Sequence, residues 1–117
     1  MNKRKANSTN FANEAFLEER CVLNKVLKAI GKRWVSEILL LVEKDVRRFS
    51  GLKDSLGEIS DTVLSQSLNE LVKSGLLQKK IYQEVPLKVE YSLSENGQSL
   101  VGHLHELCRW GKSNLEG

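Results

Sequence analysis

The sequence has few cysteines, no long apolar run and almost no charge surplus, and each absence excludes a class of protein. Its two cysteines, Cys21 and Cys108, are too few and too far apart for a disulfide scaffold or a zinc knuckle. The longest apolar run, Ile38 to Val42, is far shorter than the roughly 20 residues of a membrane-spanning helix. No apolar segment follows the polar start MNKRKANSTN, as a signal peptide would require. We therefore expect a cytoplasmic protein without membrane contacts.

The charge surplus is small and confined to the start of the chain. Lys3, Arg4 and Lys5 account for the whole net charge of +3. Apolar residues make up 40% and charged residues 28% of the 117 residues, which is typical of one folded globular domain. We expect residues 1–13, which lack helical periodicity, to form a mobile basic arm. Residues 14–117 then form a single domain.

Motifs for catalysis and cofactor binding are also missing. The chain has no G-x-S-x-G, no glycine-rich phosphate loop, and no Cys and His pair with an orienting acid. We therefore expect neither an enzyme nor a cofactor. His105 and Cys108 are spaced to share a metal ion on a helix, but His103 points elsewhere and no further ligand completes a site. We assign no metal site, and a metal-responsive repressor remains a minor alternative.

Hydrophobic periodicity predicts five helices and one β-hairpin. The predicted helices run from Glu14 or Cys21 to Ile30, from about Trp34 to Glu43, from a Ser50 cap to Gly57, from Ser60 to Gly75, and from Ser94 to about Gly111. Two strands, Leu77 to Gln83 and Lys88 to Leu93, flank a turn with the only proline, Pro86. This order is that of a winged helix-turn-helix, a mainly α-helical fold with a β-hairpin wing.

The helix that begins at Ser60 has the clearest signals in the sequence. Ser60 is suited to cap it, Asp61 complements the helix dipole, and Ile59 with Leu64 forms a hydrophobic staple. One face is apolar through Leu64, Leu68, Leu71 and Val72. The polar side of this helix, including its cap, carries the residues that we expect to recognise a partner: Ser60, Thr62, Ser65, Gln66, Asn69 and Lys73.

This polar face predicts contact with nucleic acid. Uncharged donors and acceptors such as Gln and Asn read base edges in the major groove. An exposed helix without such a role usually carries Glu and Lys instead, because they are better helix formers. A protein-binding module is the alternative, but the large apolar residues expected of a protein interface are missing from this face. We therefore predict duplex DNA as the partner.

Residues suited to contact phosphates are fewer than those suited to contact bases, and they lie among acidic residues. They are Lys79, Lys80 and Lys88 on the hairpin, and Arg47 and Arg48 ahead of the third helix. Glu70, Glu84 and Glu90 lie nearby in the sequence and cancel part of the local charge. We expect moderate affinity from a single protomer, which favours a dimer.

Several motifs in register resemble one family. They are Cys21, GKRW at 31–34, RFSGL at 48–52, IS at 59–60, the leucine pattern of 64–76, VPLKVEYSLSENG at 85–97, and Trp110 with Gly111. In these motifs the chain, over about residues 21–112, resembles the HxlR family of bacterial transcriptional regulators, which is grouped near MarR-type regulators.

The resemblance implies a homodimer that binds DNA. The helices of about residues 14–31 and 95–112 would pack across a two-fold axis, and each recognition helix would enter a major groove. Each wing would lie near the flanking backbone or minor groove. Two-fold symmetry predicts a pseudo-palindromic operator.

The resemblance also implies a sensing role for Cys21, since some family members detect oxidants or electrophiles with a cysteine at this place. A helix start near Cys21, or Lys25 and Lys28 on the same face of a longer helix, would favour the thiolate. Glu18 opposes this effect, and Val22 replaces the proline that usually follows in the family. Cys108 lies on an apolar stripe, so we expect it to pack, although an intersubunit disulfide with Cys21 is an open possibility.

Overall fold

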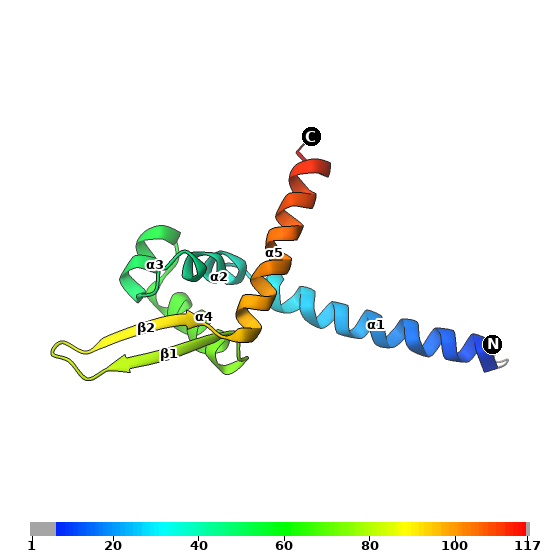
Figure 1. Ribbon diagram of the computed structural model, residues 1–117, viewed down its shortest axis with the longest axis horizontal. Coiled ribbons are helices and arrows are strands. Elements are labelled where there is room, and N and C mark those ends of the chain that lie inside the picture. Colours follow the sequence, from blue (N-terminus) through cyan, green and yellow to red (C-terminus); the bar gives the residue numbers. More distant parts are fainter. Residues whose placement is uncertain (1–6, 117) are drawn as a thin grey trace. The chain divides into compact units, whose positions relative to one another are not determined.

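The computed structural model describes the backbone of residues 7–116 and the side chains of residues 13–116. The elements along the chain, labelled in Figure 1, are α1 (Asn7–Gly31), α2 (Val35–Glu43), α3 (Phe49–Leu56), α4 (Asp61–Lys73), β1 (Leu77–Tyr82), β2 (Lys88–Leu93) and α5 (Glu95–Asn114). This order of helices around one antiparallel hairpin confirms the predicted fold class. The chain divides into two units, residues 1–32 and 33–117.

In the first unit, α1 begins at Asn7, well before either predicted start at Glu14 or Cys21. Residues 7–13, which the prediction placed in the arm, are therefore helical, while residues 1–6 lie outside the described part of the chain. The prediction relied on an apolar stripe to locate the helix start. Residues such as Ala15 and Glu19 favour a helix by intrinsic propensity alone, so the helix can continue beyond the stripe.

The described side chains of α1 are almost all exposed, and only Ile30 is half-buried. The exposed apolar residues of α1 are Phe16, Leu17, Val22, Leu23, Val26 and Leu27. Their spacing places most of them on one side of the helix. In water, a helix of this kind depends on packing of its apolar face for most of its stability.

The second unit is built around α2. Ile38 and Leu39 are completely buried, and α2 packs against α3, β2 and α5. Among the described residues, the largest fully buried side chains are Ile38, Leu39, Leu52, Leu64, Leu68 and Val101. They come from α2, α3, α4 and α5, so a single core holds the helices at the base of the hairpin. Among the described residues, no helix is both long and apolar enough to cross a membrane.

The third helix begins one residue earlier than its predicted cap. Arg48 occupies the N-cap position in an extended conformation, and Ser50 lies inside α3. The prediction of Ser50 as the cap is therefore wrong, because the Leu52 N–H donates to the Arg48 carbonyl at 3.0 Å and so places Phe49 in the first turn. Gly57, with a φ of 72°, ends the helix as predicted.

The hairpin pairs in a single register, from Leu77 opposite Leu93 to Tyr82 opposite Lys88. Strand β1 ends at Tyr82, one residue before the prediction, because the N–H of Glu84 donates to the Tyr82 carbonyl at 2.9 Å. Leu77 and Tyr91 are buried against the core, and burial raises the pKa of the Tyr91 hydroxyl. Away from the base, the hairpin extends freely from the helices (Figure 1).

Helix α5 starts where β2 ends. The hydroxyl of Ser94 accepts a hydrogen bond from the N–H of Gly97 at 3.0 Å, which confirms Ser94 as the cap. The core face of α5 ends after Leu104, and Leu107, Cys108 and Trp110 are all exposed. Cys108 therefore does not pack in the core of this chain, and that prediction is wrong. Hydrophobic periodicity shows which side of a helix is apolar. It does not show how far along the helix the neighbouring elements cover that side.

The start of α5 leaves no room for a side chain at Gly97. A Cβ atom built there would lie 2.1 Å from the carbonyl oxygen of Leu76. We predict that Gly97→Ala lowers the free energy of unfolding by roughly 1–3 kcal/mol, because the backbone must move to relieve the overlap. Urea denaturation measures this change.

Gly102→Ala is the matched control. Gly102 lies in the same helix, is exposed, and has open space at its Cβ position. This substitution should raise stability by up to about 1 kcal/mol through helix propensity. Equal stability of the two variants would contradict the close approach at Gly97.

Candidate nucleic-acid interface

As predicted, the apolar face of α4 is buried and its polar face is exposed. Leu64, Leu68 and Leu71 are buried in the core. The side chains proposed to read DNA, Ser60, Thr62, Ser65, Gln66, Asn69 and Lys73, are all exposed. Helix α4 therefore presents a continuous row of hydroxyl and amide groups to the solvent.

The start of α4 is fixed by three polar contacts. The Ser60 hydroxyl accepts a hydrogen bond from the N–H of Val63 at 3.1 Å, as expected of an N-cap. Lys53 of α3 donates to the carbonyl of Ile59 at 2.9 Å and forms an ion pair with Asp61 at 2.7 Å. Lys53 thus ties the third helix to the first turn of α4, a role that sequence reasoning missed because it depends on the angle between the helices.

The end of α4 is fixed by a glycine turn. Gly75 has a φ of 82°, and its N–H donates to the Val72 carbonyl at 3.1 Å. The N–H of Leu76 donates to the Leu71 carbonyl at 2.9 Å, which completes a Schellman motif. The Ser94 hydroxyl also donates to the Gly75 carbonyl. The recognition helix is therefore held at its end by the cap residue of α5.

The hairpin brings two of its three candidate lysines together around a tyrosine. The Nζ atoms of Lys80 and Lys88 lie 4.9 Å and 4.8 Å from the centre of the Tyr82 ring, within the range of cation–π interactions. Lys88 is paired across the hairpin with Tyr82, and Lys80 lies two residues before it on the same face. Lys79 is exposed but belongs to the opposite face, so it lies apart from this pair.

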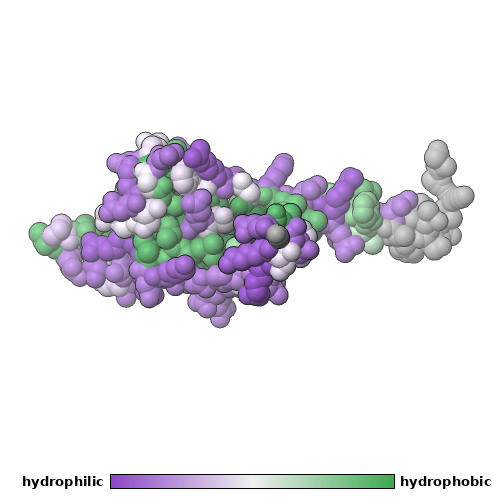
Figure 2. All heavy atoms as spheres, turned by 90° about the horizontal axis from the view of Figure 1, so that it is seen from above, coloured by the Kyte–Doolittle hydropathy of each residue, from purple (hydrophilic) through white to green (hydrophobic). Residues whose placement is uncertain are grey.

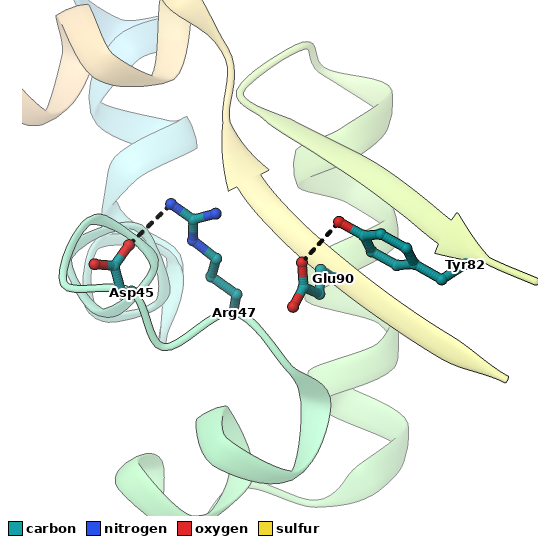
Figure 3. Close-up of polar contacts among 4 residues, drawn as sticks. All are labelled: Asp45, Arg47, Tyr82 and Glu90. Atoms are coloured by element: carbon teal, nitrogen blue, oxygen red, sulfur yellow. Dashed lines mark hydrogen bonds and ion pairs between the residues drawn. The ribbon is translucent and has the colours of Figure 1, made fainter. Parts of the chain in front are cut away.

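An acidic residue completes this cluster. The Tyr82 hydroxyl donates to Glu90 Oε1 at 3.1 Å (Figure 3), and Lys88 Nζ lies 3.6 Å from Glu90 Oε2. We call Lys80, Tyr82, Lys88 and Glu90 the wing cluster. Sequence reasoning included the two lysines but missed Tyr82, because only the hairpin register shows which residues share its face.

The two candidate arginines have different surroundings. Arg47 forms an ion pair with Asp45 at 2.9 Å (Figure 3), and its carbonyl accepts a hydrogen bond from the Tyr91 N–H at 2.8 Å. Arg48 is exposed, and in the described part of the chain no acidic side chain pairs with it. Arg48 is therefore available to bind a phosphate, whereas Arg47 would have to break its ion pair with Asp45 first.

Cys21 is exposed in the middle of α1. Because α1 begins at Asn7, the alternative in which Cys21 lies at a helix N-terminus is wrong. Lys25 and Lys28 then lie one and two helical turns beyond it, and Glu18 lies one turn before. Cys108 is a second exposed thiol, on α5.

The two histidines of α5 contact carboxylates. His105 Nε2 lies 2.8 Å from Glu43 Oε1, and His103 Nδ1 lies 3.5 Å from Glu106 Oε1. The described residues contain no group of three or more His, Cys, Asp or Glu side chains suited to a metal ion. His105 instead links α5 to the end of α2.

Comparisons with known proteins agree with this geometry. Residues 29–117 match the model of a family described as HxlR-like helix-turn-helix. The HTH-type transcriptional regulator YkvN of Bacillus subtilis is 41% identical over 91 residues, covering 78% of this chain and 77% of YkvN.

Solved structures are similar as well. The crystal structure of a putative HTH-type transcriptional regulator, ytcD, matches with a TM-score of 0.75 at 37% identity, over 81% of this chain and 97% of that one. The redox regulator HypR in its oxidized form matches with a TM-score of 0.71 at 32% identity, over 80% of this chain and 97% of HypR.

The wing cluster predicts an effect of Glu90 on DNA affinity. Glu90→Gln removes the charge that neutralises Lys88 but keeps an acceptor for the Tyr82 hydroxyl. We expect roughly two- to fivefold tighter binding to any duplex, because the freed cation can meet a phosphate. Fluorescence anisotropy at several salt concentrations measures this change.

Glu116→Gln, which changes the net charge equally at the far end of the chain, is the control and should bind as the wild type does. Tighter binding by both variants to the same degree would show an effect of net charge alone. That result would remove the wing cluster from the interface.

Proposed function

Because the chain belongs to the HxlR-like helix-turn-helix family of transcriptional regulators, we propose that it binds duplex DNA sequence-specifically as a homodimer. The observation that carries this proposal is the exposed polar face of α4, held at both ends by hydrogen bonds. Rigid placement matters because bidentate contacts to bases require defined positions of the donor and acceptor atoms.

The recognition step follows from the side chains of this face. Gln66 and Asn69 carry amides that can donate and accept at once, as the edge of an adenine requires. Thr62 and Ser65 supply hydroxyls, and Lys73 at the end of α4 supplies a cation. Arg48 and the lysines of the wing add phosphate contacts, which position the helix without reading sequence.

Dimerisation is supported by the apolar surface of the helices at each end of the chain. The face of α1 carries Leu23, Val26 and Leu27 exposed, and α5 exposes Leu107 and Trp110. Surfaces of this kind on a small domain mark a contact with another molecule. A two-fold dimer through these helices presents two copies of α4 to half-sites of a pseudo-palindromic operator.

We further propose that oxidants or electrophiles regulate the DNA affinity through Cys21. The thiol is exposed and therefore accessible to reagents. HypR, which matches this chain in fold and sequence, is named a redox regulator. Oxidation of Cys21 of one protomer with Cys108 of its partner would form one S–S bond, and the two thiols would give two electrons and two protons to the oxidant.

The polar face of α4 should control discrimination between sequences. We predict that Gln66→Ala and Asn69→Ala each reduce the preference for the operator over random duplex by roughly 1–3 kcal/mol.

Lys80→Ala should weaken binding to all duplexes alike and lower the salt dependence of the binding affinity. Fragments selected from genomic DNA of the source organism supply the operator, and anisotropy titrations measure both quantities.

Asn96→Ala, which removes an exposed amide from the start of α5, is the control for loss of an amide. It should leave discrimination unchanged. If the α4 and wing variants lose affinity in the same manner, base reading by α4 is wrong.

The thiol proposal predicts a covalent dimer after mild oxidation. Treatment with diamide should shift the protein to dimer mobility on a non-reducing gel and change its operator affinity. Cys21→Ser and Cys108→Ser should each abolish the shift. A wild-type protein that remains a monomer on the gel, with unchanged DNA affinity, would contradict regulation by Cys21.

A further inference from the structure

A shallow groove lies on the surface between α2 and α3, which pack side by side (Figure 1). It has a volume of about 230 Å³ and is lined by Glu37, Leu40, Leu41, Lys44, Ser55 and Leu56. Leu40 and Leu41 are only half-buried, and with Leu56 they make the centre of the groove apolar. Seen from above Figure 1, apolar atoms gather in the region of α2, beside α5 (Figure 2). An apolar centre with a polar rim is the arrangement of a protein interface.

The two charged residues of the groove lie near opposite ends of α2. Glu37 is in the first turn, and Lys44 is the C-cap. Two helical turns, or about 10 Å, separate them, so both lie on the same side of the helix as Leu40 and Leu41. Both are exposed, and among the described residues neither side chain takes part in an ion pair. The rim thus offers one anion and one cation to another molecule.

This pattern of side chains is complementary to itself. Two copies of α2 can pack antiparallel around a two-fold axis that passes between Leu40 and Leu41. Glu37 of each copy then faces Lys44 of the other, and Leu40 of each copy faces Leu41 of the other. Antiparallel packing also brings the positive end of one helix beside the negative end of the other. A second copy of this chain therefore matches both the charges and the apolar centre of the groove.

Other occupants fit this groove less well. Sites for small molecules commonly have volumes of roughly 300–1,000 Å³, and this groove is smaller and open to solvent. A DNA phosphate would be attracted by Lys44 but repelled by Glu37. An unrelated protein would need the same pair of charges at the same spacing, which the chain itself already supplies.

We infer that the α2–α3 groove is a second contact between copies of this chain, through which one DNA-bound dimer associates with the next. This inference rests on the proposed function, in which the dimer forms through α1 and α5. The groove is small, and small interfaces are weak and transient. Two dimers on neighbouring operators have a high effective concentration for each other, so a weak contact is sufficient for cooperative binding.

Charge reversal tests the contact in the absence of DNA. Sedimentation velocity of the wild type at increasing concentration should show dimers that associate reversibly into tetramers. Glu37→Lys and Lys44→Glu should each weaken this association at least about tenfold, because the two-fold axis converts two attractive pairs into two repulsive pairs. Both side chains are exposed, so the melting temperature should change little.

Two rescue experiments separate charge pairing from a general effect of charge. The double variant Glu37→Lys, Lys44→Glu should regain the association, because the exchanged charges still form pairs across the axis. An equimolar mixture of the two single variants should also associate, since each supplies the charges that the other lacks. Glu84→Lys, which reverses an exposed charge on the hairpin turn, is the control and should associate as the wild type does. Failure of both rescues would overturn the inference.

A duplex with two operators links the contact to DNA binding. The operators are placed on the same side of the duplex, at spacings of whole helical turns. At one or more of these spacings, the second wild-type dimer should bind about tenfold more tightly than the first. Each single variant should fill the two operators independently, with the affinity that it shows for one operator alone. Anisotropy titrations of both duplexes measure these affinities.

The remaining outcomes separate the inference from the proposed function. A wild type that stays dimeric at every concentration and fills the two operators independently would overturn the inference and leave the proposed function intact. Single variants that dissociate into monomers would also overturn it, because the groove would then form the primary dimer. Association and rescue in a protein that binds no duplex would support the contact between copies and contradict the proposed function.

Discussion

The structure depends on one constraint: α4 must be rigid while its outward face stays free of contacts. The solution is to hold the helix from behind and at its ends. Leu64 and Leu68 are buried in the core, Lys53 and Ser60 fix the first turn, and the glycine turn after Lys73 fixes the last. In the part of the chain that the structure describes, no contact that fixes the helix uses Gln66 or Asn69, and both side chains are exposed.

Electrostatics adds a second constraint, because two cations of the proposed interface already have carboxylate partners. Lys88 and Arg47 are both close to carboxylates of the same chain. Each must give up an intramolecular partner when it meets a phosphate, so the net gain is small. Under the proposed function, affinity would come from several modest contacts and from two copies of the site, and specificity would come from the uncharged groups.

Local signals in the sequence predicted much of the fold and of the recognition helix. A cap such as Ser60 and a turn such as Gly57 act within a few residues, so the sequence alone can show them. The errors have a common physical cause. The early start of α1 depends on helix propensity in residues before the apolar stripe. The grouping of Lys80 and Lys88 around Tyr82 depends on the hairpin register. The exposure of Cys108 depends on where the helices next to α5 end. Periodicity reports none of these.

The junction between α4 and α5 has a mechanical consequence. The carbonyl of Leu76 accepts the N–H of Ser94 at 3.1 Å, and Gly97 is so close to the same oxygen that even a methyl group does not fit. Because there is no free space at this point, we expect the end of α4 and the start of α5 to move together about this peptide group. A rotation of the C-terminal half of α5, where Cys108 and Trp110 are exposed, would therefore reorient the polar face of α4.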